Sequence, residues 1–481
     1  AGCTTVRVIV AYASKDSFLK SLETWSDWRQ LGAMTSKCSY PIFVLTVLTI
    51  AWIPLSAELR LPSIFTDHMV LQRDQPIKVW GWDEPGTAIT VNFAGEAYVS
   101  EAEADGKWTV EMKPSPANAE PQILIVSGSE LRLISDVLVG DVWICSGQSN
   151  MEWALSNDWT GDLNALSADN PNLRLISVPR VGTQELQKDF NGAWAVSSPE
   201  EALEFSAVGY YFGKHLQGIL DIPIGLIDNA WGGSAAEAWI RRDVIEADPR
   251  FAERMASVRE KETELSTPEA RAELEKSRED FPRALAEWER LRDRALETGE
   301  PVPPRPRRPR DWLEGNRRPG NIFAGVLHPT IGYGIRGVIW YQGEANASRA
   351  AEYRDLFPFM IEHWRVEWDQ GNFPFYWVQL ADYKKEVEQP GDSEWAELRE
   401  AQTMTQSLPN TGQAVIIDLG EGSDIHPRDK YNVAARLARW ALAKDYGFDI
   451  AYRSPQYTGM TVKKDEVLVT IDCFGSALRT F

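Results

Sequence analysis

The stretch DVLVGDVWICSGQSNMEW, residues 136–153, joins an apolar run to a polar turn that carries a serine. Its VLV and VWI segments are apolar and rich in β-branched residues, which is the composition of a strand buried on both faces. The SGQSN segment that follows is small or polar and ends this run. The next residues suit the start of a helix, because Glu152 would lie in the first turn, where the helix dipole favours a negative charge. We therefore predict a buried strand, a turn and a helix in this order.

Ser149 lies in the predicted turn. A serine at a strand-to-helix turn has an exposed hydroxyl, and backbone N–H groups converge near it. A serine nucleophile needs both features. A turn serine is more commonly a helix cap, however, and Gly-x-Ser also occurs by chance. This stretch alone makes Ser149 a candidate nucleophile and no more.

Three later stretches repeat the pattern of an apolar strand followed by a polar turn. Residues 225–239 (GLIDNAWGGSAAEAW) and 337–347 (GVIWYQGEANA) run into turns that contain glycine, and residues 414–427 (AVIIDLGEGSDIHP) end in Asp-x-His. Together with GQSNM, these stretches resemble the sialate O-acetylesterase family of SGNH-type serine hydrolases, and the resemblance extends over residues 59–472. It implies an α/β fold of three layers (α/β/α) around a parallel sheet, with an N-terminal β-sandwich-like domain and a helical insertion.

The length and composition are those of a globular protein with two or three domains. The chain has 481 residues, of which 43% are hydrophobic and 25% are charged. Its formal net charge of −20 argues against binding to nucleic acid or to an anionic membrane surface, because like charges repel each other. Neutral or partly masked carbohydrate is compatible with this charge.

The cysteines and histidines do not indicate a disulfide framework, a metal site or another cofactor. The four cysteines include no Cys-x-x-Cys pair, and Cys145 lies inside the predicted buried strand. The five histidines are not paired at the spacing of metal ligands. A catalytic histidine therefore has few candidates, which are His68, His215, His328, His363 and His426.

Residues 34–57 (MTSKCSYPIFVLTVLTIAWIPLSA) have the layout of a secretory signal peptide, with a lysine, an apolar run and small residues near the end. The alternative is a membrane anchor, but the apolar run at 42–53 is shorter than the roughly 20 residues that a span needs. We therefore expect a secreted or periplasmic protein with no stable membrane insertion after signal cleavage. Residues 1–33 precede the better start at Met34 and are interpreted as an upstream extension.

The rest of the chain divides by its patterns of apolar residues. Residues 58–135 alternate apolar and polar residues in short runs, which predicts an N-terminal β-domain. Residues 136–244 and 320–452 alternate strands with helices, so the catalytic parallel sheet comes in two parts. Residues 453–481 are interpreted as the start of a truncated C-terminal β region. The predicted strands of the parallel sheet are LRLISV (173–178), PIGLID (223–228), GVIWYQ (337–342), PFYWVQL (374–380) and AVIIDLG (414–420).

Residues 245–319 differ in composition from both flanking parts. They begin with a segment dense in Glu, Arg, Ala and Leu, which predicts a helical hairpin. They continue with VPPRPRRPR (302–310), which the prolines restrict to an extended linker. The mixed charges indicate a solvated insertion without a binding role of its own, although an insertion just before the 337–347 stretch could form one wall of the cleft.

Ester hydrolysis through a serine needs a nucleophile, a base, an acid that orients the base, and an oxyanion hole. Ser149 is the candidate nucleophile and His426 is the candidate base. Asp424 is the candidate acid, because Asp-x-His places acid and base on one loop. The SGNH resemblance implies an acid three residues before the histidine, where this chain has Ser423, so Asp418 at the predicted strand end stays open as the alternative.

For the oxyanion hole we expect the backbone N–H of Ser149, by analogy with other strand-to-helix turns. A second donor is expected from the N–H of Gly232 or Gly233, because glycine lets the backbone approach a tetrahedral intermediate closely. The resemblance implies a third donor from an amide side chain in the block WYQGEANA. Gln342 would supply it, and Asn346 is the less favoured substitute.

Several aromatic residues flank these motifs. Aromatic rings stack well on sugar faces, but most such residues pack the core. We expect only one or two of them to contact a ligand, and we expect Glu344 to orient its neighbours rather than act as a base. The flanking aromatic residues are Trp143, Trp153, Trp231, Trp239, Trp340 and Tyr341.

Together these features predict a secreted carbohydrate O-acetylesterase that acts through a serine acyl-enzyme on an O-acetylated sugar or glycan. The resemblance points to sialic acid, but no residue selects sialic acid over an acetylated plant or algal polysaccharide, so an acetylxylan-type esterase stays open. The rival from another class is a non-catalytic carbohydrate-binding protein with a degenerate site. The joint presence of Ser149, Gly233, Gln342 and His426 argues against such decay.

Overall fold

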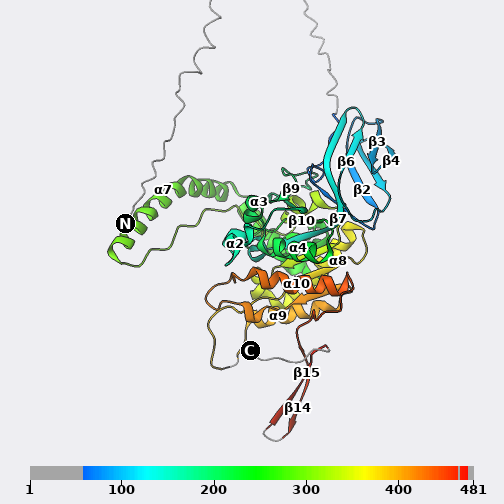
Figure 1. Ribbon diagram of the computed structural model, residues 1–481. Helices are drawn as coiled ribbons and strands as arrows, with labels where there is room; N and C mark the ends of the chain where they lie inside the picture. The colour runs from blue at the N-terminus through cyan, green and yellow to red at the C-terminus, as the bar shows by residue number, and fades with distance from the viewer. Residues whose placement is uncertain (1–57, 390, 464–465, 475–481) are drawn as a thin grey trace, which may run out of the picture. The chain divides into compact units, whose positions relative to one another are not determined.

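The structure is a computed structural model that describes residues 58–389, 391–463 and 466–474 (Figure 1). The predicted upstream extension at 1–33 and the signal peptide at 34–57 lie outside the described residues. Within the described part, no helix has both the length and the apolar character needed to cross a membrane.

Strand β7 (Leu131–Gly147) is shared by two sheets. Its first part pairs antiparallel with β6 (Asn118–Ser127) in the N-terminal β-domain. Its last part pairs in parallel with β10 (Ile224–Asp228) on one side and with β11 (Gly337–Tyr341) on the other. This last part is buried throughout, as the apolar VLV and VWI segments predict.

The strands of the catalytic sheet lie in the order β13-β12-β11-β7-β10-β8-β9. All neighbours in this order are parallel except β8 and β9, which are antiparallel. The strands not yet given are β8 (Asn170–Ser177), β9 (Ala195–Ser197), β12 (Phe375–Val378) and β13 (Thr411–Ala414).

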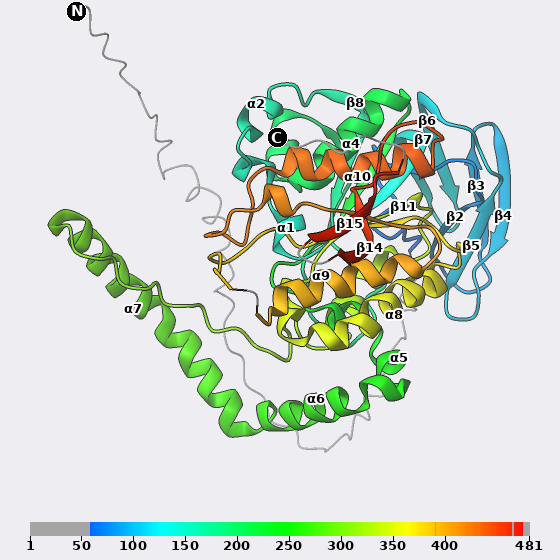
Figure 2. The ribbon, with the colours of Figure 1, turned by 90° about the horizontal axis from the view of Figure 1, so that it is seen from below.

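Helices cover both faces of this sheet (Figure 2). Helices α4 (Ala207–Leu220) and α10 (Lys430–Lys444) pack with one set of core residues on one face. Helices α8 (Ala350–Trp368) and α9 (Glu394–Met404) pack on the opposite face. The expected three-layer α/β/α fold is confirmed.

One predicted strand is displaced along the sequence. The stretch AVIIDLG was expected to be a strand, but β13 ends at Ala414, and Ile417 is 47% exposed. The neighbouring strand β12 ends at the same level, where the N–H of Gln379 donates to the Ala414 carbonyl. The β-branched residues therefore lack a partner strand and begin the loop that leads to His426.

The N-terminal β-domain contains two sheets, as a β-sandwich requires. Strands β2 and β5 form one antiparallel pair, whereas β3, β4 and β6 continue into β7. Alternate residues of these strands are buried, so each sheet contributes one face to the core. The strands are β1 (Val70–Gln72), β2 (Ile77–Trp82), β3 (Ala88–Phe93), β4 (Glu96–Glu101) and β5 (Lys107–Met112).

The expected domain boundary at Asp136 falls inside β7, so the two domains share a strand instead of being joined by a linker. Asp136 has φ = 54° and lies where the strand passes from one sheet to the other. Its carboxylate accepts a hydrogen bond of 2.6 Å from Arg174 and lies 2.6 Å from Nδ1 of His68. His68 is therefore placed in a structural contact, away from Ser149.

The insertion does not fold as the predicted hairpin. After α5 (Arg242–Ala247), the helices α6 (Ala252–Leu265) and α7 (Pro268–Thr298) follow one another at an angle, and α7 extends away from the sheet (Figure 2). The break is explained by Thr267, whose side chain caps α7, and by the proline at the first position of that helix.

The Pro-rich linker, rather than α6, runs back along α7 (Figure 2). The indole N–H of Trp288 in α7 donates to the carbonyl of Pro303 at 2.8 Å. The guanidinium of Arg305 lies 5.5 Å from the centre of the same indole. A helix and an extended strand-like linker thus form the arm of the insertion.

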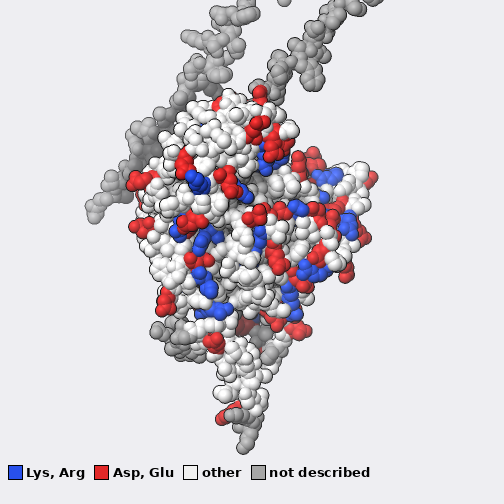
Figure 3. All heavy atoms as spheres, turned by 90° about the vertical axis from the view of Figure 1, so that its right-hand side faces the viewer, with Lys and Arg blue, Asp and Glu red and all other residues white. Residues whose placement is uncertain are grey.

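Short elements complete the described chain. Helices α1 (Ser149–Glu152) and α2 (Gly161–Ala165) follow β7, and α3 (Pro199–Glu204) follows β9. The predicted C-terminal β region forms a hairpin of β14 (Gln456–Lys463) and β15 (Glu466–Asp472). Figure 3 shows acidic and basic side chains interspersed over the face that carries the β-domain, and few charges on the hairpin below.

Gly147 is the position at which β7 ends and the chain turns toward Ser149. Its φ is 135°, and a Cβ atom added there would lie 2.2 Å from the backbone oxygen of Tyr341 on β11. Side chains are disfavoured by both the dihedral angle and the neighbouring backbone.

We predict that Gly147→Ala lowers the free energy of unfolding by about 3 kcal/mol or more, because backbone strain and overpacking add. Gly218→Ala is the matched control, since it lies exposed in α4 with nothing within 4 Å of an added Cβ. This control should raise stability by about 0.5–1 kcal/mol. Urea unfolding of both variants checks the prediction, and equal stability of the two would contradict it.

Candidate active site

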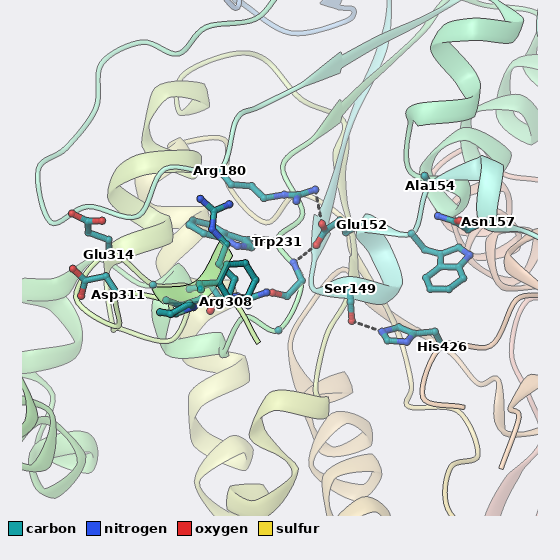
Figure 4. A pocket seen from close by; sticks show the side chains of 18 of the residues that line it. Ser149, Glu152, Ala154, Asn157, Arg180, Trp231, Arg308, Asp311, Glu314 and His426 are labelled. Atoms are coloured by element: carbon teal, nitrogen blue, oxygen red, sulfur yellow. Dashed lines mark hydrogen bonds and ion pairs between the residues drawn. The ribbon is translucent and has the colours of Figure 1, made fainter. Parts of the chain in front are cut away.

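A cavity of about 1490 Å³ opens beside Ser149 (Figure 4). Figure 4 shows Ser149 and His426 on one side and Asp311 and Glu314 on the opposite side. The second side is formed by α7, the linker and the residues that follow the linker, so the insertion does form one wall of the cleft. The catalytic-domain lining includes Ser149, Glu152, Trp153, Trp231, Gly233 and His426, and the insertion lining includes Arg278, Phe281, Pro282, Arg308 and Asp311.

Ser149 and His426 are in hydrogen-bond contact across the fold. Ser149 is the first residue of α1, and its Oγ lies 2.9 Å from Nε2 of His426. The turn is held by Gln148, whose N–H donates to the Tyr341 carbonyl and whose side-chain oxygen accepts from the N–H of Ala345. A hydroxyl that donates to a neutral imidazole is in the arrangement needed for proton removal.

Asp424, and not Asp418, lies beside the imidazole. The Asp424 carboxylate accepts from the backbone N–H of His426 at 2.9 Å and lies 3.6 Å from its Nδ1. Asp418 instead forms two hydrogen bonds of 2.6 Å with Arg436, and these bonds hold the pKa of its carboxyl below the usual range. The Asp424 contact is longer than a hydrogen bond, and such contacts often tighten only when substrate binds.

Trp153 supplies a second contact to the imidazole. Its indole stacks on His426 with ring centres 5.2 Å apart and an interplanar angle of 19°. Of the six flanking aromatic residues, Trp153 and Trp231 line the cavity, whereas Trp143, Trp239, Trp340 and Tyr341 are fully buried. The structure therefore exposes two of the six to the cavity.

The loop after β10 brings Gly232 and Gly233 next to Ser149. The Gly232 N–H is already donated to the Glu152 carboxylate, which also contacts Arg180 at 2.5 Å. Gly233 has φ = 76°, and its N–H, like that of Ser149, has no acceptor among the residues that the structure describes. Of the two candidate glycines, Gly233 is therefore the one with a free N–H at the cavity.

The carbonyl groups of this loop are held by the end of the insertion. The side-chain amide of Asn316 donates to the Gly232 carbonyl at 2.5 Å, and the guanidinium of Arg317 donates to the Gly233 carbonyl at 3.1 Å. These contacts fix the peptide plane that contains the free Gly233 N–H and the peptide plane that follows it.

The hypothesis that Gln342 donates to an oxyanion is corrected by its surroundings. Gln342 is fully buried, and its amide donates to the Ser234 carbonyl at 3.1 Å and to Oδ1 of Asn346 at 2.7 Å. Its own oxygen accepts from the Tyr353 hydroxyl. Both amide protons are engaged, so Gln342 supports the loop from behind. Asn346 is buried as well and donates to Glu237, so it is not a substitute.

Comparison with known proteins agrees with this geometry. The family model described as carbohydrate esterase, sialic acid-specific acetylesterase matches residues 139–271 and 317–440, which is more than half of the chain. The chain belongs to this family. It is a carbohydrate esterase related to sialate O-acetylesterases, which confirms the resemblance stated above. The match leaves out residues 272–316, which comprise most of α7 and the linker.

Two kinds of relatives cover most of this esterase. The sialate O-acetylesterase of Mus musculus is 29% identical over 470 residues, covering 89% of this chain and 81% of the relative. The Homo sapiens sialate O-acetylesterase is 28% identical, and the match covers 84% of this chain and 74% of the relative. The crystal structure of a carbohydrate acetylesterase from Xanthomonas citri is 35% identical, has a TM-score of 0.70 and covers 88% of this chain and 83% of that one.

The other histidines of the esterase are engaged away from Ser149. His328 contacts the Gln187 carbonyl through Nδ1, and His363 accepts from the N–H of Arg241. His215 lies in α4, next to the ring of Tyr431. Among the described residues, no group of three or more His, Cys, Asp or Glu side chains could hold a metal ion.

The site contains residues that the sequence did not single out. Glu152 was expected only as a favourable charge in a helix turn, yet it binds the Gly232 loop. Asn150 and Lys430 form a buried contact beneath the Ser149 turn. Lys430 carries no motif signal, because its partners are far away in the sequence. Glu344 was expected to orient its neighbours, and it accepts from Asn150 at 2.6 Å.

The acid can be identified by matched substitutions. We predict that Asp424→Asn lowers kcat by about a hundredfold or more, toward the roughly 10⁴-fold loss of a serine protease triad without its acid. Asp418→Asn removes an exposed ion pair with Arg436 and should change kcat less than about threefold and stability by at most about 1 kcal/mol. Steady-state kinetics of folded variants check this ranking, and the reverse ranking would transfer the role to Asp418.

Proposed function

We propose that this esterase removes O-acetyl groups from a glycan through an acyl-enzyme on Ser149. The observation that carries the proposal is the 2.9 Å contact between Oγ of Ser149 and Nε2 of His426 at the wall of the cavity. His426 would take the hydroxyl proton as Oγ attacks the acetyl carbonyl carbon. The N–H groups of Ser149 and Gly233 would stabilise the oxyanion that forms.

The same residues complete both steps of the reaction. In acylation, the imidazolium of His426 would give its proton to the leaving sugar oxygen as the C–O bond breaks, which leaves an acetyl group on Ser149. In deacylation, water would attack the acyl-enzyme with His426 as the base, and the imidazolium would then protonate Oγ of Ser149 as acetate leaves. Asp424 and the face of Trp153 would stabilise the imidazolium in both steps.

The cavity supports an oligosaccharide as substrate. Its volume of about 1490 Å³ exceeds the range of roughly 300–1,000 Å³ that is typical of small-molecule sites. Trp153 and Trp231 offer aromatic faces for sugar rings, and the arm of the insertion closes the far side. The names of the relatives favour O-acetylated sialic acid, while an acetylxylan-type substrate is the alternative that uses the same chemistry.

We predict that Ser149→Ala lowers acetate release from every active substrate by at least about 10⁴-fold and abolishes labelling by a fluorophosphonate. Ser423→Ala is the matched control, because it is exposed on the His426 loop and should retain activity. Acetate release from acetylated sialosides, acetylxylan and p-nitrophenyl acetate identifies the substrate class. Labelling of Ser149→Ala at the wild-type rate would show that another serine is the nucleophile. A wild-type protein that binds these glycans but hydrolyses none of them would favour the binding-protein rival.

We also propose that the protein is exported, because residues 34–57 have the layout of a signal peptide. Expressed from Met34 in a bacterial host, it should be found outside the cytoplasm with a new N-terminus near Glu58, as determined by N-terminal sequencing. Leu45→Arg places a charge in the apolar run and should keep the protein inside. Recovery of the uncleaved wild-type chain from the membrane fraction would show an anchor instead.

A further inference from the structure

A buried lysine lies behind the Ser149 turn, and its burial lowers the pKa of the Lys430 ammonium to about 7. Lys430 is the first residue of α10 and has no exposed surface. Its Nζ donates to the amide oxygen of Asn150 at 2.5 Å rather than to a carboxylate. A lysine is seldom fully buried, because removing its charge from water is costly unless partners compensate.

Asn150 connects this lysine to two other segments. Its amide nitrogen donates to Oε1 of Glu344 at 2.6 Å and to the carbonyl of Ile425 at 3.0 Å. Asn150 directly follows Ser149, and Ile425 directly precedes His426. The Asn150 side chain therefore links the residue after the nucleophile to the residue before the base.

Glu344 ends this chain of contacts on the far side. It follows β11, and burial raises the pKa of its carboxyl. Its Oε2 is buried without a hydrogen-bond partner among the described residues. The Asn150 amide thus lies between a buried lysine and a buried carboxyl group, in a chain of hydrogen bonds of the kind whose members polarise one another.

The same lysine also contacts the platform beneath the imidazole. Nζ of Lys430 lies 5.6 Å from the centre of the Trp153 indole, the ring on which His426 stacks. The lysine is therefore connected to His426 through the Ile425 carbonyl and through the indole. Both connections affect the orientation of the His426 ring. The long contact between Asp424 and His426 does not fix this orientation alone.

We infer that Lys430 is a positioning residue, which holds the Ser149 turn and the His426 loop together through Asn150 and places a positive charge behind the imidazole. This inference rests on the proposed function, because it assumes that His426 acts as the base. Lys430 and Asn150 contact neither the cavity nor the reacting atoms.

The charge has a consequence for pH dependence. The pKa of His426 is lowered, first by burial and then by the charge of Lys430, while Asp424 opposes the shift. The other charged groups around this unit are Glu421 and Arg428 on the same loop, Asp158 and Glu344 around Lys430, and Glu152 on α1. Activity needs neutral His426, so the acid limb of kcat/KM lies below the ordinary histidine pKa, and removing the lysine charge should move this limb to higher pH.

Two substitutions separate the positioning role of Lys430 from the effect of its charge. Lys430→Met removes the charge and the hydrogen bond, whereas Lys430→Gln removes the charge but keeps a donor for Asn150. With p-nitrophenyl acetate, we predict that Lys430→Met lowers kcat by about tenfold to a hundredfold with little change in KM. Lys430→Gln should retain more of kcat. In both variants the acid limb should rise by on the order of one pH unit, because removing a nearby positive charge favours the protonated imidazole.

Lys444→Met is the matched control, since this lysine is exposed at the other end of α10. This substitution should change neither kcat nor the acid limb of kcat/KM. A wild-type kcat together with an unmoved acid limb in Lys430→Met would overturn the inference. A loss of kcat with an unmoved limb in both variants would do so as well, because it would show a purely structural role. Should Lys430→Met fail to fold, the acid limb of Lys430→Gln decides the question. If Ser149→Ala remains active, the proposed function fails first, whatever the lysine variants do.

Discussion

The close approach of Gly147 to the backbone of Tyr341 is the constraint on which the site depends. Adjacent parallel strands end side by side there, and only a residue without Cβ lets the first strand turn at that distance. The turn places Ser149 at the cavity and directs the Gln148 side chain into the loop after β11, where it accepts from Gly343 and Ala345. Ser149 is therefore supported by two central strands of the sheet, which give its turn a rigid base.

The parts of the site that could be predicted from the sequence are those defined by short segments. Buried apolar runs identified β7, β10 and β11, and turns within a few residues of their ends located Ser149, Gly233 and His426. Asp424 lies next to the imidazole because it is two residues from His426 on the same loop. Its role as the acid stays a prediction, because the sequence left Asp418 open as the alternative.

The parts that could not be predicted depend on contacts across the fold. Gln342 has the right side chain at the right place in its motif, but its amide nitrogen donates to Asn346 and to the carbonyl of Ser234, and Ser234 is 108 positions away in the sequence. Lys430 looks like an ordinary charge at a helix start until burial and Asn150 are seen. The displaced strand has the same cause, since β-branched residues form a strand only where a neighbouring strand remains to pair with them.

The cavity is lined by two parts of the chain, which are the catalytic domain and the insertion. Its composition predicted helices and an extended linker, but the angle between α6 and α7 follows from a cap and a proline at one joint. The arm lines one side of the cavity, while Asn316 and Arg317, which follow the linker, hold the loop that carries Gly233. A change in the arm can therefore alter the shape of the cavity without moving Ser149 or His426, provided that these two anchors stay in place.

The sharing of β7 also limits how such a protein can evolve. A domain joined by a linker can be lost or replaced by recombination at the boundary, but here that boundary lies within a strand whose far end carries the nucleophile turn. Cutting the gene at this point would separate β6 from its partner and leave the middle strand of the catalytic sheet without its beginning. The N-terminal β-domain and the catalytic sheet are therefore expected to be inherited as one unit.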